Sequence, residues 1–293
     1  MNIVVALTVV AALLTAGLAI KVPVWPLHTW LPPAHTTAPT AGSVLLAAVL
    51  LKMGTYGLVR LPLATVPGGF ARLAPALAVL GAVGILWGGL ACLVERDLKR
   101  LVAYSSVAHM GFVVLALAAG SSTGLQAALF ANVAHGVISA LLFVVVGGLK
   151  ERWGSADLET ARAALREVAP RLGFSLLLGL AAALGLPGLA GFWGEWLAVY
   201  AAWSPAPDRP LGLLRACAVA AVLGTVLAAG YALRVARLVW SGARTEPRVE
   251  DARSVEWGVI AALVAAVVVL GVLPGPLLAT TSSAASALVG AAP

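Results

Sequence analysis

The chain has 293 residues, of which 61% are hydrophobic and 11% charged, and its formal net charge at pH 7 is +7. With a mean hydropathy of +1.00, this composition excludes a large soluble domain and predicts an integral membrane protein. In a soluble protein such a positive charge would point to nucleic acid, but here the basic residues flank apolar runs, as membrane topology requires. We therefore expect the lipid bilayer as a partner, and no nucleic acid.

Apolar runs of about 20 residues predict transmembrane helices. The predicted spans are 2–20 with a continuation to 35, 40–62, 74–94, 101–119, 125–149, 171–204, 212–240 and 255–280. The longest polar connection, from 150 to 170, has charge spacings that suit a short surface helix; its charged residues include Asp157, Glu159, Arg162, Arg166 and Glu167. The sequence thus predicts an all-α, polytopic membrane protein of about eight helices in a single membrane domain.

Basic residues are unequally divided between the two faces that alternating spans define. The loops at 95–100, 150–171 and 234–253 share one face and carry thirteen lysines and arginines, against Arg60, Arg72, Arg209 and Arg215 on the other. By the positive-inside rule, the first face is cytoplasmic. We expect a multi-pass protein of the cell inner (plasma) membrane with both termini outside.

The first apolar run contains residues that interrupt a helix. Pro23, Pro26, Pro32 and Pro33 fall within it or just after it, and each proline removes a backbone donor and crowds the preceding turn. The helix is therefore predicted to break near Lys21.

A second interruption lies in the sixth run. Gly185, Pro187 and Gly188 break the apolar sequence, and Glu195 follows shortly after. Irregular backbone at membrane depth is tolerated where it is buried in protein or lines a polar cavity, and paired interruptions are typical of transporters built from inverted repeats. The two breaks predict polar paths, although two kinks in a structural bundle would give the same pattern.

Ionisable side chains lie inside these runs. Lys21 and Lys52 precede Glu95, the first acidic residue of the chain, and a charge within the membrane costs at least a few kcal/mol. Such residues mark ion paths by default. Two unit charges 4 Å apart interact by about 4 kcal/mol at an effective dielectric constant of 20, so a moving partner charge can load or unload a buried lysine.

Polar residues also recur at helical spacing on three spans. The stripes are Lys52, Thr55 and Tyr56; Ser105, Ser106 and His109; and Asn132, His135 and Ser139. A single histidine in an apolar helix is more often a hydrogen-bonded packing residue than a proton carrier. Three stripes together with Glu195 favour a proton relay.

Other kinds of site are disfavoured by what the sequence contains. Cys92 and Cys217 stand alone in separate apolar runs, so they predict neither a disulfide framework nor an iron–sulfur or zinc site. The sequence has no Walker loop and no dinucleotide-binding glycine pattern after a strand. We expect no metal, cofactor or redox centre in this chain.

Five ordered motifs carry a family resemblance. The chain resembles the antiporter-like, proton-translocating membrane subunits of respiratory complex I, in particular the subunit M or chain 4 type, which are related to subunits of Mrp antiporters and membrane-bound hydrogenases. The motifs are KVPVWPLHTWLPPAH, APTAGSVLLAAVLLKMGTYGLVR, ERDLKRLVAYSSVAHMGF, AHGVISALLF and GLPGLAGFWGEWL. The resemblance implies an inverted-repeat fold with two discontinuous helices. It implies that 1–62 ends the first repeat, 74–241 forms the second, and 255–281 is the final transmembrane helix.

The resemblance also implies roles for individual residues. Proton transfer is expected through Lys21, Lys52, His135 and Glu195, with His109 as a less secure carrier. Lys52 resembles the central lysine of the family's lateral hydrophilic axis, and the charge of Lys21 would be tied to a glutamate on an earlier helix. The remaining motif residues shape the broken helices, and two of them, His28 and His35, are equally suited to carrying protons; the set is Pro23, Pro26, His28, Pro32, His35, Pro187 and Gly188.

Two departures from the family pattern stand out. Pro33 replaces an aspartate, and about six helices that precede Lys21 in the family are not in this sequence. The chain therefore resembles the C-terminal part of such a subunit. The implied partners are other membrane subunits and a chain that supplies the missing helices, with NADH, FMN, iron–sulfur clusters and quinone in partner subunits. The alternatives are an Mrp-type cation/proton antiporter subunit, a membrane-bound hydrogenase subunit, or a truncated fragment that transports nothing.

Overall fold

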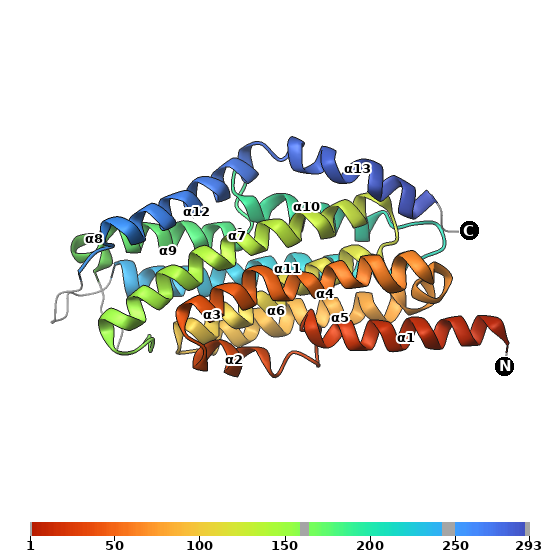
Figure 1. Ribbon diagram of the computed structural model, residues 1–293, viewed down its shortest axis with the longest axis horizontal. Coiled ribbons are helices and arrows are strands. Elements are labelled where there is room, and N and C mark those ends of the chain that lie inside the picture. The colour runs from red at the N-terminus through yellow and green to blue at the C-terminus, as the bar shows by residue number, and fades with distance from the viewer. Residues whose placement is uncertain (1, 159–163, 242–249, 291–293) are drawn as a thin grey trace.

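The computed structural model describes residues 2–158, 164–241 and 250–290, which form a bundle of roughly aligned helices (Figure 1). In these ranges seven helices are long and apolar enough to cross a membrane. They are α1 (Ile3–Lys21), the composite span Thr40–Leu63, α5 (Pro67–Val94), α6 (Leu98–Ala118), α7 (Ser122–Trp153), the composite span Leu211–Trp240 and α12 (Ser254–Val272). The all-α, polytopic prediction is confirmed.

The predicted sixth span is a pair of short helices. α9 (Pro170–Ala183) and α10 (Ala190–Trp203) have 14 residues each, and each is too short to cross a bilayer alone. Between them Gly185 and Gly188 have φ angles of 74° and 88°, which side chains with a Cβ rarely adopt. The predicted break is confirmed, and glycine is what permits its backbone path.

The first predicted break is also present. α1 ends at Lys21, and α2 (Leu31–Thr37) begins with proline in its first turn. The Trp30 indole donates a hydrogen bond of 2.9 Å to the Ile20 carbonyl and so closes the intervening loop. The peptide bond before Pro26 is cis.

The span Thr40–Leu63 is not a uniform α-helix. α3 (Thr40–Leu45) and α4 (Leu51–Leu58) are joined by a π-helical segment, η1 (Leu46–Leu50), and a second one, η2 (Val59–Leu63), follows α4. A third, η3 (Ala236–Trp240), continues α11 (Leu211–Val235). Single π turns shift the register of side chains and recur at functional sites; η1 ends directly before the turn that carries Lys52.

α6 is the central helix. In its most apolar stretch 89% of residues are buried, against 17% in α1 and in α12. α5 approaches it closely because glycines face each other: a Cβ at Gly81 would lie 2.8 Å from the Gly111 carbonyl oxygen. Small residues that let backbones approach are a common means of helix association in membranes.

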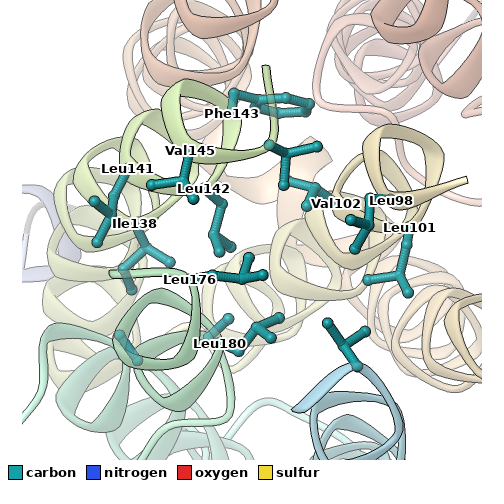
Figure 2. Packing of buried hydrophobic residues seen from close by; sticks show 14 of the residues in the cluster. Leu98, Leu101, Val102, Ile138, Leu141, Leu142, Phe143, Val145, Leu176 and Leu180 are labelled. Atoms are coloured by element: carbon teal, nitrogen blue, oxygen red, sulfur yellow. The ribbon is translucent and has the colours of Figure 1, made fainter. Parts of the chain in front are cut away.

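Branched and aromatic side chains fill the space between α6, α7 and α9 (Figure 2). Leu101 and Val102 of α6 meet Leu142 of α7, and Leu176 and Leu180 of α9 complete the cluster. All five are at most 2% exposed. This packing fixes the relative positions of the three helices around the site described below.

Two expectations about boundaries need correction. The third span begins at Pro67, not at 74, because proline suits the first turn of a helix. The last span is not one helix over 255–280: α12 ends at Val272, and α13 (Gly275–Gly290) follows Pro274, which cannot donate to the preceding turn. Figure 1 shows α13 continuing from α12 at an angle.

The long polar connection carries less helix than expected. α7 runs on to Trp153 and ends at Gly154, whose φ is 71°, and only the four-residue α8 (Leu165–Val168) follows. Arg166 and Glu167 lie on α8, and Asp157 forms an isolated bridge with Asp97. Glu159 and Arg162 lie outside the described residues.

The described parts of the basic loops gather at one end of the bundle (Figure 1). The bridge between Asp97 and Asp157 joins two of them, and Arg152 Nη2 lies 2.5 Å from Glu256 Oε2 at the start of α12. α1 begins and α13 ends at the opposite end (Figure 1). The two groups of loops inferred from alternation therefore correspond to the two ends of the molecule.

Candidate functional site

Lys52 begins a string of titratable side chains inside the bundle. Its Nζ donates a hydrogen bond of 2.7 Å to the carbonyl of Ala47 in η1, and it also contacts Nδ1 of His135 on α7. α4 and its π segment reach α7 closely because Gly136 follows His135: a Cβ there would be 3.2 Å from the Ala48 carbonyl oxygen. The glycine of the Ala-His-Gly motif thus makes room for the lysine–histidine contact.

His109 of α6 continues the string. Its ring lies 5.2 Å from the His135 ring, centroid to centroid. Nδ1 is 2.6 Å from the Ser105 carbonyl oxygen, and Nε2 is 2.8 Å from the carbonyl oxygen of Ala183, the last residue of α9. A neutral imidazole donates from one nitrogen only, whereas an imidazolium donates from both. This arrangement of acceptors accommodates a His109 ring that carries the extra proton.

Glu195 of α10 closes the string. Its Oε1 lies 3.4 Å from His109 Nε2, and the two side chains are only 12% and 11% exposed. The carboxyl group fits into the second break, because a Cβ at Gly185 would lie 2.7 Å from Glu195 Oε2. Thr225 of α11 is within interaction range of the carboxyl group and lines the same cavity. The break in the helix therefore leaves the space that the carboxylate occupies.

The string runs across the helices and not along them. Lys52 lies near the middle of Thr40–Leu63, and His109 near the middle of α6. The contacts pass from α4 to α7, then to α6 and finally to α10. If the helices cross a bilayer, the string lies in the plane of the membrane.

Cavities lie along this string. One of about 20 Å³ is lined by His109, His135 and Glu195, and a water molecule needs about 10–15 Å³ of such volume together with polar neighbours. At the lysine end a groove of about 590 Å³ is lined by Lys52 and Asn132. At the other end a cavity of about 230 Å³ is lined by Glu195 and residues of α10 and α11.

Lys21 is near the string but not joined to it. α4 packs against the first break, and a Cβ at Gly54 would lie 3.2 Å from the carbonyl carbon of Lys21. Within residues 2–158, 164–241 and 250–290 no hydrogen-bond or ion-pair partner of the Lys21 amine is found. The structure thus brings together Lys52, His135, His109 and Glu195 and leaves Lys21 beside them.

The two other predicted histidines are buried. His28 is 4% exposed and His35 0%; the His35 ring stacks on Phe143 with centroids 4.4 Å apart and planes 15° apart. In the described part of the chain neither His35 nitrogen has a hydrogen-bond partner. Pro23 and Pro26 lie in the first break, Pro32 lies in the first turn of α2, and Pro187 and Gly188 lie in the second break.

Three polar residues near the string were not singled out from the sequence. Lys99 lies in the first turn of α6, is 2% exposed, and donates a hydrogen bond of 2.6 Å to the Ala38 carbonyl; it is within electrostatic range of His35. Thr225 reaches Glu195, and Tyr231 of α11, 2% exposed, reaches Ser105. For Thr225 and Tyr231 the available signal was a polar residue within an otherwise apolar span, whereas Lys99 stands among the charged residues of the loop at 95–100.

Discontinuous helices around a buried string of titratable side chains define a multi-pass membrane protein, and this arrangement is typical of transporters. Residues 2–232 match the family described as NADH:quinone oxidoreductase/Mrp antiporter, transmembrane. The chain belongs to this family.

Individual relatives agree with this assignment. The chain is 39% identical over 265 residues to NADH-quinone oxidoreductase subunit M of Rhodobacter capsulatus, covering 88% of this chain and 49% of that protein. A chain of respiratory complex I from Thermus thermophilus is 31% identical with a TM-score of 0.84, covering 96% of this chain and 58% of that one. A chain of the Mrp complex from Dietzia sp. DQ12-45-1b shares the fold, with a TM-score of 0.84, 22% identity and coverage of 95% and 59%. The chain spans about half the length of the curated relatives it matches.

Proposed function

We propose that this chain translocates protons as part of an NADH–quinone oxidoreductase of the complex I type. The carrying observation is the string Lys52–His135–His109–Glu195, in which successive side chains touch inside the bundle. Its relatives named as subunit M support the assembly. Because the chain spans only about half of their length, the activity and partners of the whole protein belong to the proposal.

The histidine rings provide the route. When the Lys52 ammonium donates to His135 Nδ1, the proton of a neutral His135 ring lies on Nε2. A second proton that arrives at Nδ1 allows the one on Nε2 to leave toward the cavity shared with His109 and Glu195. The 20 Å³ of this cavity admits one water molecule as the bridge. This water passes a proton to the His109 ring, and Glu195 accepts a proton from His109 Nε2 across 3.4 Å.

In this proposal the redox chemistry takes place in other subunits. NADH, FMN, iron–sulfur clusters and quinone would bind to partner chains, and this chain would respond to their charge changes through its amines. The end of the bundle with the basic loops would face the cytoplasm of a bacterial cell, with both termini outside, since that face carries the excess of lysine and arginine.

A further membrane partner would supply a counter-charge for Lys21. Its amine has no polar partner in the described parts of the chain, and an unpaired charge within a membrane costs at least a few kcal/mol. A helix carrying a carboxylate, packed against α1 and α4, would neutralise it. Other membrane subunits of the assembly would cover the remaining apolar faces.

The test is a lysine exchange in the assembled complex. Lys52→Ala removes the amine that contacts His135, while Lys150→Ala removes a lysine near the end of α7, away from the string. We expect Lys52→Ala to lower the number of protons moved per electron in proteoliposomes, and Lys150→Ala to leave it unchanged. Normal assembly with an unchanged proton-to-electron ratio in Lys52→Ala would refute the proposal.

A further inference from the structure

The break between α9 and α10 lies against the end of α12, where the chain breaks before α13. A Cβ at Gly271, in the last turn of α12, would overlap the carbonyl oxygen of Gly188 in the break between α9 and α10. Gly271 is buried, and the chain breaks again at Pro274 before α13. Backbone therefore meets backbone at the point where neither helix is continuous.

One side chain bridges this junction. The Trp193 indole of α10 donates a hydrogen bond of 2.8 Å to the Gly271 carbonyl. The last four carbonyls of a helix have no donor from their own helix, and Pro274 offers no backbone N–H. Trp193 thus satisfies a carbonyl that the end of α12 leaves open.

The same short helix carries Glu195 on its other side. Residues two positions apart on a helix, such as Trp193 and Glu195, are separated by about 200° around its axis. The contacts agree: Trp193 contacts α12, while Glu195 lies near His109 of α6 and Thr225 of α11. α10 has only 14 residues and no helical continuation before Ala190. Its placement depends on contacts such as these two.

α12, which carries the hydrogen-bond acceptor of Trp193, is held in place at both ends. At its beginning Glu256 pairs with Arg152 of α7 and accepts a hydrogen bond from the backbone of Arg253. At its end Gly271 is held against the second break. A helix secured at both ends can determine where the neighbouring α10 stands.

We propose that Trp193 is a positioning residue that ties α10 to the end of α12 and so sets the separation of Glu195 from His109. The inference rests on the proposed function, because that separation governs proton transfer at this end of the string. At 3.4 Å the pair is just outside the usual range of about 2.7–3.2 Å for a direct hydrogen bond. An increase of about 0.5 Å would change the attraction of two unit charges enough to shift an equilibrium about threefold at an effective dielectric constant of 20.

The experiment compares two tryptophans of α10 in the assembled complex. Trp193→Phe removes the indole N–H, and Trp203→Phe makes the same chemical change at the last residue of α10, which is 47% exposed. The infrared band of the Glu195 carboxyl group, assigned by its loss in Glu195→Gln, and the proton-to-electron ratio are measured in both. We expect Trp193→Phe to shift the band and lower the ratio, and Trp203→Phe to change neither.

Two further measurements keep the outcomes separate. If Trp193→Phe does not assemble, benzothienylalanine at position 193, which keeps the shape of tryptophan without the N–H, decides in its place. An unshifted band with an unchanged ratio in the assembled protein overturns the positioning role. If Lys52→Ala leaves proton translocation intact, the proposed function fails, while the infrared band still tests whether Trp193 places Glu195.

Discussion

Replacing Gly185 by alanine tests whether the second break leaves the space that the Glu195 carboxylate occupies. Gly185 has a φ of 74°, and holding an alanine in this left-handed region costs roughly 1–2 kcal/mol. Its new Cβ would also lie 2.7 Å from Glu195 Oε2. The carboxyl group is the end of a flexible side chain, so it moves, by about 0.7 Å if ordinary contact begins near 3.4 Å.

That displacement has an electrostatic consequence. If the 3.4 Å between His109 Nε2 and Glu195 Oε1 grows by this amount, the attraction of two unit charges falls from about 4.88 to about 4.05 kcal/mol at an effective dielectric constant of 20. The difference of about 0.8 kcal/mol corresponds to about a fourfold change in a rate or an equilibrium. We expect Gly185→Ala to lower proton translocation by about this factor while NADH oxidation continues.

Gly188→Ala is the matched control. Gly188 has a similar φ of 88°, but a Cβ there has no neighbour within 4 Å, so it shares the backbone strain without touching Glu195. Thermal unfolding of the purified assembly should show similar losses of stability in both variants. Translocation in proteoliposomes should fall in Gly185→Ala alone; an equal fall in both would show that strain, and not the carboxylate position, is responsible.

Two other substitutions probe the string and its surroundings. His135→Leu removes the ring between Lys52 and His109, and we expect proton translocation to be lost in an assembled complex that still oxidises NADH; persistent translocation measured in vesicles would exclude this ring as the route. Lys99→Met removes a buried charge within electrostatic range of His35, so translocation should fall, whereas Arg100→Met, whose side chain is 45% exposed, should leave it unchanged; equal rates in the two variants would count against a role for Lys99.

The helix breaks could be predicted because their causes are local. Proline lacks the N–H that a helix needs, and glycine alone adopts positive φ readily, so the residues from Pro23 to Pro32 and from Gly185 to Gly188 mark both interruptions. The end of α12 has the same cause in Pro274. It was missed because the apolar run continues past it to 280, and hydropathy does not distinguish one span from two helices joined at an angle.

The composition of the string was accessible, but its geometry was not. Ser105, Asn132 and His135 are buried, as helical spacing suggests, and the His109 side chain is 11% exposed. The third stripe is divided, since Thr55 is 0% and Tyr56 58% exposed. Which stripe meets which depends on contacts between distant helices, such as the close approach of α4 to α7 at Gly136. The spacing of polar residues in the sequence also does not predict a π-helical segment such as η1, which sets the register of Lys52.

The charge of Lys21 is not balanced by any neighbour in the described parts of the chain. The string places Glu195 opposite His109 and gives Lys52 a carbonyl and a ring nitrogen, whereas Lys21 has no such neighbour in the described ranges. On the span Thr40–Leu63, Leu45, Val49 and Met53 form a stripe at helical spacing, each more than half exposed. Apolar side chains there suit lipid or another helix equally, but the amine does not suit lipid. The unmet charge, and not the apolar stripe, is therefore what favours a carboxylate-bearing helix as the neighbour of α1 and α4.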